Sequence, residues 1–89
     1  MEEQQFRSDL AANEYECKEF SRLANTYNPY HTHPWHARLF IQEGELTLTT
    51  PEGERTYRSG DSCELEAGTV HSERVGPGEM RGLLGTKQP

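Results

Sequence analysis

The sequence has few basic residues, few hydrophobic residues and few cysteines. Its 89 residues include nine Lys and Arg against fifteen Asp and Glu, which gives a formal net charge of −6 at pH 7. Because the chain has no basic stripe, it lacks the electrostatic footprint of proteins that bind nucleic acids or anionic membranes. No apolar run approaches the ~20 residues that span a bilayer. We therefore expect neither a nucleic acid nor a membrane as a partner.

The two cysteines, Cys17 and Cys63, are not arranged as Cys-x-x-Cys. This spacing gives no support for a zinc finger or a dithiol redox site. Each cysteine is expected to be a reduced, partly buried residue, as in most cytosolic chains. The first five residues are acidic and polar, unlike a secretory signal peptide. A cytoplasmic location is therefore the default expectation.

Short stretches of alternating residues between turn residues dominate the pattern. Residues 3–12 differ, because Phe6 and Leu10 are spaced for one face of a short helix that begins with acidic residues. The strands are predicted at residues 15–23, 30–33, 38–42, 45–50, 55–58, 62–65, 70–75 and 80–85. This succession predicts a single all-β domain, 1–89, with a barrel or sandwich core over about 14–86 and a short N-terminal helix or arm.

The hydrophobic content of 31% is a lean supply for a core. A chain this short buries only ~60–65% of its unfolded surface. Phe40 is expected to point away from the core, because its neighbours Leu39 and Ile41 share the opposite face of the strand. We therefore predict a homodimer, in which the N-terminal segment with Phe6 and Leu10 helps to cover the Phe40 face.

Histidine is concentrated in one place. Three of the four histidines, His31, His33 and His36, lie within six positions, and the fourth is His71. An H-x-H pair in an extended strand puts both rings on one face, and neutral imidazole is the commonest metal ligand. An isolated pair of this kind is more often at the surface without a metal. A metal site needs a further ligand from a remote strand, which His71 can supply.

The residues around the first histidines resemble the first motif of the cupin family. That motif reads Gly, five residues, His-x-His, three or four residues, Glu, six residues, Gly. Here Asn25 stands at the first position, His31 and His33 form the His-x-His pair, and Gly44 is the last residue. Counting back from Gly44 places the Glu position at Ala37.

The residues around His71 resemble the second cupin motif. That motif reads Gly, five residues, Pro-x-Gly, two residues, His, three residues, Asn. Gly60, Gly68 and His71 match it in register, whereas Glu66 stands at the Pro position and Val75 at the Asn position. Together the two motifs span residues 25–75, over half of the chain.

The resemblance implies a double-stranded β-helix, the jelly-roll or cupin barrel. It also implies a divalent metal near one mouth, bound by His31, His33 and His71. The neutral nitrogen donors suit zinc, iron, manganese, nickel or copper and do not choose among them. Small single-domain cupins of this kind are often dimers, which agrees with the homodimer predicted above.

The family's metal site commonly includes a glutamate, but Ala37 cannot ligate. Three arrangements are open. His36 lies one position away, after Pro34, and is the fourth ligand that we favour. Glu73 lies two residues after His71, so in a regular strand it faces the same way and is the alternative ligand, outer-shell partner or acid/base group. In the third arrangement, water completes the shell.

The motif positions also predict a pocket inside the barrel. If the side chain at position 37 faces inward, Leu39 and Ile41 do so too, and Glu73 lines the opposite wall. An apolar cavity with a few polar groups is the usual form of a small-molecule site. Leu39 and Ile41 are equally expected as ordinary core residues.

Three classes of function compete on this sequence. The first is an enzyme of the oxygenase or isomerase type, and the second is a module that binds or senses a small molecule. The third is a non-catalytic cupin without metal. We favour a small metal-binding cupin that binds or transforms a small molecule, with the non-catalytic sensing or binding cupin as the alternative. The sequence identifies neither a substrate nor a catalytic residue.

Overall fold

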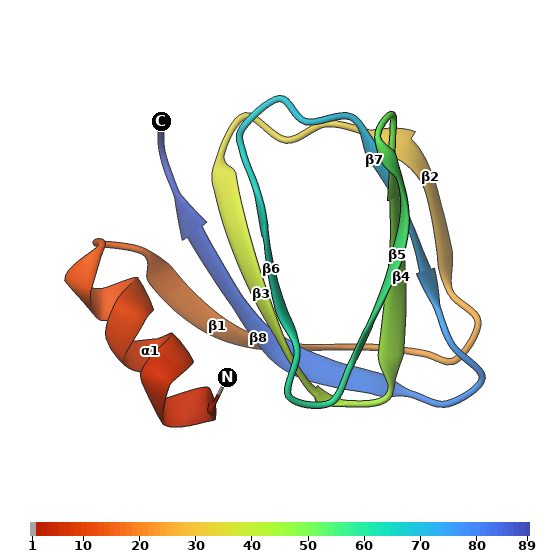
Figure 1. The fold of residues 1–89 in the computed structure, drawn as a ribbon, viewed down its shortest axis with the longest axis horizontal. Helices are drawn as coiled ribbons and strands as arrows, with labels where there is room; N and C mark the ends of the chain where they lie inside the picture. The colour runs from red at the N-terminus through yellow and green to blue at the C-terminus, as the bar shows by residue number, and fades with distance from the viewer. Residues whose placement is uncertain (1) are drawn as a thin grey trace.

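The fold consists of two facing β-sheets and one helix. The computed structural model describes residues 2–89. The elements in chain order are α1 (Glu3–Ala12), β1 (Glu16–Arg22), β2 (Tyr27–His31), β3 (His36–Glu43), β4 (Glu45–Thr50), β5 (Gly53–Arg58), β6 (Ser62–Leu65), β7 (His71–Val75) and β8 (Met80–Lys87). Figure 1 shows α1 on the outer side of one sheet, away from the second sheet. Among the described residues, no helix combines the length and apolar character of a transmembrane span.

Each sheet has four antiparallel strands. The strand orders are β1-β8-β3-β6 and β2-β7-β4-β5, so strands from both halves of the chain alternate in each sheet. The connections between β3 and β4, β5 and β6, and β7 and β8 cross from one sheet to the other, as the bends in Figure 1 show. This arrangement is a jelly-roll barrel, which confirms the predicted all-β fold.

The main core lies between the sheets. Its buried members are Leu39, Ile41, Leu46, Leu48, Val75 and Met80. Leu39 and Ile41 come from one sheet, and Leu46 and Leu48 come from the other. In both strands the apolar side chains of the alternating pattern point into the core, as expected. Each fully buried side chain of this size contributes ~1.5–3 kcal/mol relative to an exposed one.

A second core joins α1 to the outside of the first sheet. Phe6 and Leu10 pack with Phe40 and Leu83, and all four are buried. Leu10 sits over Gly85, where an added Cβ would lie 2.7 Å from a Leu10 methyl carbon. The helix of the same chain therefore covers the Phe40 face, as predicted for this segment. The homodimer stays a prediction, and covering Phe40 does not require it.

β4 and β6 have the predicted bounds, the other strands differ from theirs by one to three residues at an end, and two of these differences follow from the pairing of the strands. β2 begins at Tyr27 instead of residue 30 and includes Pro29, because it lies at the edge of its sheet and pairs with β7 on one side only. His33 lies beyond the end of β2. β8 extends to Lys87 instead of residue 85 because it pairs with both β1 and β3, so residues 86 and 87 are held in the sheet.

Candidate metal centre

Three histidines meet inside one end of the barrel. One ring nitrogen from each of His31, His33 and His71 lies within 4.8 Å of the other two. The ring centroids of His31 and His71 are 4.3 Å apart, and those of His33 lie 4.8 Å from His31 and 5.3 Å from His71. The structure therefore brings together the three histidines that the two sequence motifs supply.

The pairing of β2 with β7 positions two of these rings. His31 lies opposite His71, and Asn28 lies opposite Glu73. Three positions separate the residues on β2 but only two separate their partners on β7, so β2 carries a bulge at this point. A bulge inserts one extra residue and re-aims the following side chain. His31 consequently faces the same side of the sheet as Asn28.

His33 is held by a connection between the two motifs. It lies after β2, and its carbonyl accepts a hydrogen bond of 2.8 Å from the backbone N–H of Gly68. Gly68 has a φ of +82°, a left-handed conformation that favours glycine. Gly68 of the second motif thus holds the loop that carries His33 of the first motif in place.

Backbone carbonyls fix the tautomers of two histidines. The Nδ1 atom of His31 lies 2.7 Å from the Pro29 carbonyl oxygen, and that of His71 lies 2.9 Å from the Thr69 carbonyl oxygen. A carbonyl only accepts hydrogen bonds, so each Nδ1 carries the hydrogen and donates it. In the neutral rings, Nε2 then has a free lone pair, which is the arrangement that metal-binding histidines commonly show.

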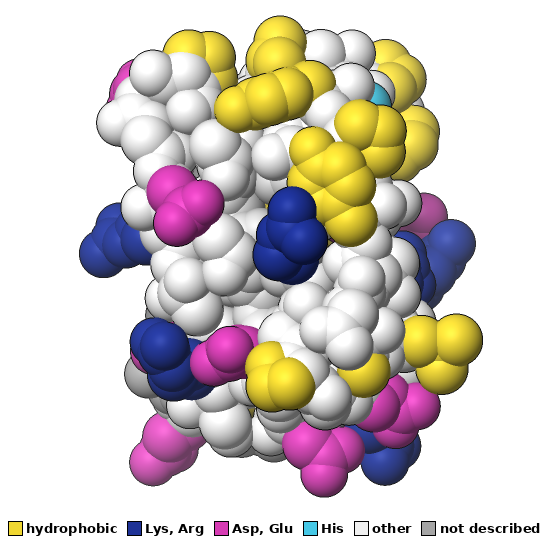
Figure 2. Space-filling model, turned by 90° about the vertical axis from the view of Figure 1, so that its right-hand side faces the viewer, with side chains coloured by type: hydrophobic (Ala, Val, Ile, Leu, Met, Phe, Trp, Pro, Cys, Tyr) yellow, Lys and Arg dark blue, Asp and Glu magenta, His cyan; other side chains and the backbone are white. Residues whose placement is uncertain are grey.

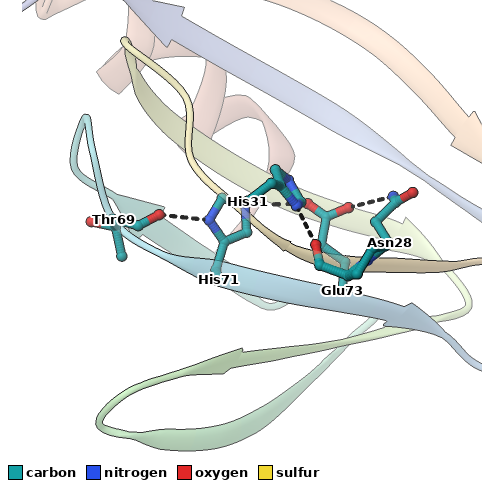
Figure 3. Close-up of polar contacts among 6 residues, drawn as sticks. Asn28, His31, Thr69, His71 and Glu73 are labelled. Atoms are coloured by element: carbon teal, nitrogen blue, oxygen red, sulfur yellow. Dashed lines mark hydrogen bonds and ion pairs between the residues drawn. The ribbon is translucent and has the colours of Figure 1, made fainter.

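A carboxylate adjoins the cluster, as predicted from the position of Glu73. Its Oε2 atom lies 3.6 Å from His71 Nε2, and the side chain is 20% exposed. Its Oε1 atom accepts a hydrogen bond of 3.1 Å from the Asn28 amide. Figure 3 shows the Glu73 carboxylate between Asn28 and the imidazole rings. With His71 neutral, Nε2 and Oε2 are two facing acceptors, and a cation beside both relieves their repulsion. The donor set thus fits a divalent metal.

The surroundings of His33 favour the neutral form of its ring. Burial lowers the pKa of His33, and the neighbouring His31 and His71 lower it further, against a smaller opposing effect of Glu73. The His33 ring stacks on Trp35, with centroids 4.7 Å apart and planes at 15°. A neutral imidazole is the form that binds a metal.

His36 does not join the other histidines, in contrast to our sequence-based preference. It is the first residue of β3, and its Nδ1 accepts a hydrogen bond of 3.0 Å from the backbone N–H of Ala67. Position 36 is thus part of the regular pairing of β3 with β8, where it lies opposite Lys87. The strand begins directly after Trp35, so no irregular backbone turns the ring toward the cluster.

The predicted pocket residues divide into two groups. Leu39 and Ile41 are 6% and 1% exposed and belong to the core, whereas Glu73 belongs to the histidine site. None of the three lines the cavity of about 730 Å³. The cavity is lined by residues from β4, the β4–β5 turn, β5, the end of β6 and the segment before β7. These residues are Leu48, Thr50, Pro51, Glu52, Gly53, Glu54, Arg55, Tyr57, Glu64, Leu65, Glu66, Thr69 and Val70.

Exposed apolar side chains surround the histidine end of the barrel. Figure 2 shows hydrophobic side chains gathered at one end of this face, with part of a histidine visible among them. Tyr30 is 56% exposed and Val70 is 43% exposed, and they directly precede His31 and His71 in the chain. This end of the barrel therefore carries exposed apolar side chains in addition to the histidines.

The sequence reasoning missed Asn28 and the two carbonyls that orient His31 and His71. Pro29, just before the predicted strand 30–33, was the available signal, because proline in a strand marks an edge or a bulge. The partner of Asn28 depends on the register of β2 against β7, which the sequence pattern does not specify.

Comparison with known proteins agrees with this architecture. A family model described as a cupin domain matches residues 22–83. The comparison with curated proteins gave no match. A cupin superfamily protein from Desulfitobacterium hafniense is 17% identical, with a TM-score of 0.72 over 84% of this chain and 68% of that chain.

Two further solved structures have the same fold. A protein of unknown function from Rhizobium leguminosarum is 13% identical, with a TM-score of 0.79 over 84% of this chain and 71% of that one. The polyketide cyclase RemF from Streptomyces resistomycificus is 24% identical, with a TM-score of 0.69 over 84% of this chain and 56% of that one. At these identities the structures show a common fold, and the match of the family model over most of the sequence establishes that this chain belongs to the cupin family.

Proposed function

We propose that this protein is a small cupin that binds one divalent transition metal through His31, His33 and His71 and uses the site to bind or transform a small molecule. The observation that carries the proposal is the arrangement of the three imidazole rings and of the hydrogen bonds that orient two of them. Their ligand atoms converge within 4.8 Å, while the Nδ1 atoms of His31 and His71 are already engaged by carbonyls. Both rings thus direct Nε2, the metal-binding nitrogen, away from those carbonyls.

The fourth protein ligand in this proposal is Glu73. Its Oε2 atom is 3.6 Å from His71 Nε2, whereas His36, at the start of β3, is engaged by the backbone N–H of Ala67 in the turn after β6. Three neutral imidazoles leave the full charge of a divalent ion uncompensated, and one carboxylate offsets part of it. The donor set of three nitrogens and one oxygen suits zinc, iron, manganese, nickel or copper.

A metal at such a site supplies Lewis acidity toward an oxygen of a bound small molecule. The chain's own residues orient the ligands and shape the approach. Tyr30 and Val70 are exposed apolar side chains at the same end of the barrel, and they suit a ligand with an apolar portion beside its metal-binding oxygen. RemF is described as a polyketide cyclase. That likeness gives a precedent for an enzyme on this fold and does not choose between catalysis and binding here.

Metal analysis of protein purified without a His tag tests the proposal. We expect about one metal ion per chain after refeeding with transition ions. His71→Ala should abolish binding, and His36→Ala is the matched control that should retain it. Wild-type protein that stays metal-free after refeeding with zinc, iron, manganese, nickel and copper would refute the proposal. Equal losses in the two variants would remove the assignment of the site.

A further inference from the structure

We propose that Asn28 is a positioning residue that fixes the Glu73 carboxylate as the anionic ligand of the metal site. The proposal rests on the metal-binding function proposed above and adds a residue at a position that neither cupin motif specifies. Asn28 donates from Nδ2 to Glu73 Oε1 at 3.1 Å, and the other oxygen of the same carboxylate lies 3.6 Å from His71 Nε2. Asn28 thus acts on the site through Glu73 and does not itself touch the metal.

The bulge in β2 makes this contact compatible with the histidine site. Asn28 lies opposite Glu73 and His31 lies opposite His71, across a stretch with one extra residue on β2. In a regular strand, residues three positions apart face opposite sides of the sheet. Without the bulge, Asn28 and His31 would not both face inward. The bulge in β2 therefore places both the ligand His31 and Asn28, the partner of Glu73, on the inner face of the sheet.

The chemistry of the amide suits a positioning role. The terminal torsion of a glutamate is broad, so an unrestrained carboxylate samples many orientations. A hydrogen bond to Oε1 restricts that rotation and directs Oε2 toward His71. Asn28 is neutral, so it leaves the negative charge of the carboxylate available for a cation. A lysine or arginine at the same place would compensate that charge and compete with the metal.

Glu73 thereby takes over the role that Ala37 leaves vacant. Ala37 is 7% exposed and lies in the middle of the sheet, opposite Leu65 on one side and Thr86 on the other. Its methyl group offers no ligand. The carboxylate of this chain consequently comes from β7, on the same strand as His71, and not from β3. This relocation explains why a polar partner is needed on the neighbouring edge strand β2.

A double-mutant cycle tests the proposal through metal affinity. The Kd for Zn²⁺ is measured by competition with a chelating dye in wild type, Asn28→Ala, Glu73→Ala and the double variant. We expect Asn28→Ala to weaken binding by about tenfold or more, as removal of an outer partner of a metal ligand commonly does. Glu73→Ala should weaken binding at least as much. The double variant should equal Glu73→Ala, because Asn28 acts only through Glu73.

Two further variants separate positioning from general stability. Asn13→Ala is the matched control, because Asn13 also donates one side-chain hydrogen bond, to the Asp9 carbonyl on α1, and should leave the Zn²⁺ affinity unchanged. Asn28→Leu keeps the approximate size of the side chain but removes the donor without adding a charge, so it should weaken binding about as much as Asn28→Ala. Thermal unfolding of the metal-free variants shows whether each remains folded, and Asn28→Leu provides the test if Asn28→Ala is not folded.

The outcomes distinguish this inference from the proposed function. If Glu73→Ala and His71→Ala lose affinity but Asn28→Ala and Asn28→Leu do not, Asn28 has no positioning role and the metal site stands. If Asn28→Ala weakens binding equally with and without Glu73, its effect is structural and the inference is wrong. If the wild-type protein binds no metal, the proposed function itself fails.

Discussion

The indole ring of Trp35 stacks on the imidazole of His33, with centroids 4.7 Å apart and planes inclined by 15°. Trp35 lies between the end of β2 and the start of β3, so this contact joins the loop to the ring that it carries. An offset aromatic pair of this kind contributes ~0.5–1.5 kcal/mol beyond its buried area. The stack therefore restricts the orientation of the His33 ring.

The same stack makes Trp35 a reporter of metal binding. It is the single Trp of the chain, so the indole fluorescence comes from one place. Titration with Ni²⁺ or Cu²⁺ should quench this fluorescence with a saturating curve, because open-shell ions quench an adjacent indole. His71→Ala should show no saturating phase. An identical curve in His71→Ala would mean that the ion binds elsewhere, for example at exposed carboxylates.

The fold and three site residues could be predicted from the sequence because they depend on local pattern. The alternation of Leu46 and Leu48 with threonines reports a strand with one buried face, and His31, His33 and His71 occur at the motif spacings. Such features need only the order of residues along the chain. The alternation and the motif spacings therefore predict the strands and the three histidines, although they do not give the geometry of the cluster.

The remaining site features depend on register between strands that are far apart in the sequence. Asn28 meets Glu73 because β2 pairs with β7 through a bulge, and no local pattern gives the position of that bulge. The geometry gives no support to the preference for His36 as a ligand, for a related reason. β3 begins at His36, and the ring accepts a hydrogen bond from the Ala67 N–H and is not part of the group formed by the other three histidines.

The two cysteines should differ in reactivity. Cys17 is exposed on β1, whereas burial and, to a smaller extent, the charge of Glu73 raise the pKa of the Cys63 thiol to about 12. Alkylation requires the thiolate, so Cys63 should stay unreactive throughout the range from pH 7 to 9. Mass spectrometry should find one iodoacetamide adduct on the native protein and two on the denatured protein. Native Cys17→Ser should take up none, and labelling of Cys63 in the native state would contradict its burial.

His36 should contribute to stability and not to metal affinity. His36→Ala removes the acceptor of the Ala67 N–H and should lower the free energy of unfolding by about 1 kcal/mol. His36→Asn keeps a side-chain acceptor and should recover part of that loss. Urea unfolding of the metal-free protein measures both values. A large loss of Zn²⁺ affinity in His36→Ala, with stability unchanged, would return His36 to the set of ligands.

The docking of α1 should depend on Leu10. This side chain is 1% exposed and packs with Phe6, Phe40 and Leu83, whereas Leu23 is 74% exposed and provides a matched control. Leu10→Ala removes buried methyl groups and leaves a cavity, so it should cost ~2–5 kcal/mol in the free energy of unfolding. Leu23→Ala should stay within about ±0.5 kcal/mol of wild type. Urea unfolding of both variants makes the comparison.

The result for Leu10→Ala also bears on the outer face of the first sheet. A helix of ten residues is marginal in water unless it packs on something, so loss of the Leu10 contacts should release α1 and expose Phe40. Light scattering of Leu10→Ala should then show association through the uncovered face, while wild type and Leu23→Ala keep their own state. If Leu10→Ala matches Leu23→Ala in stability and association, α1 does not form the cover of this face. The Phe40 surface would then be left for a second subunit, as the sequence alone suggested.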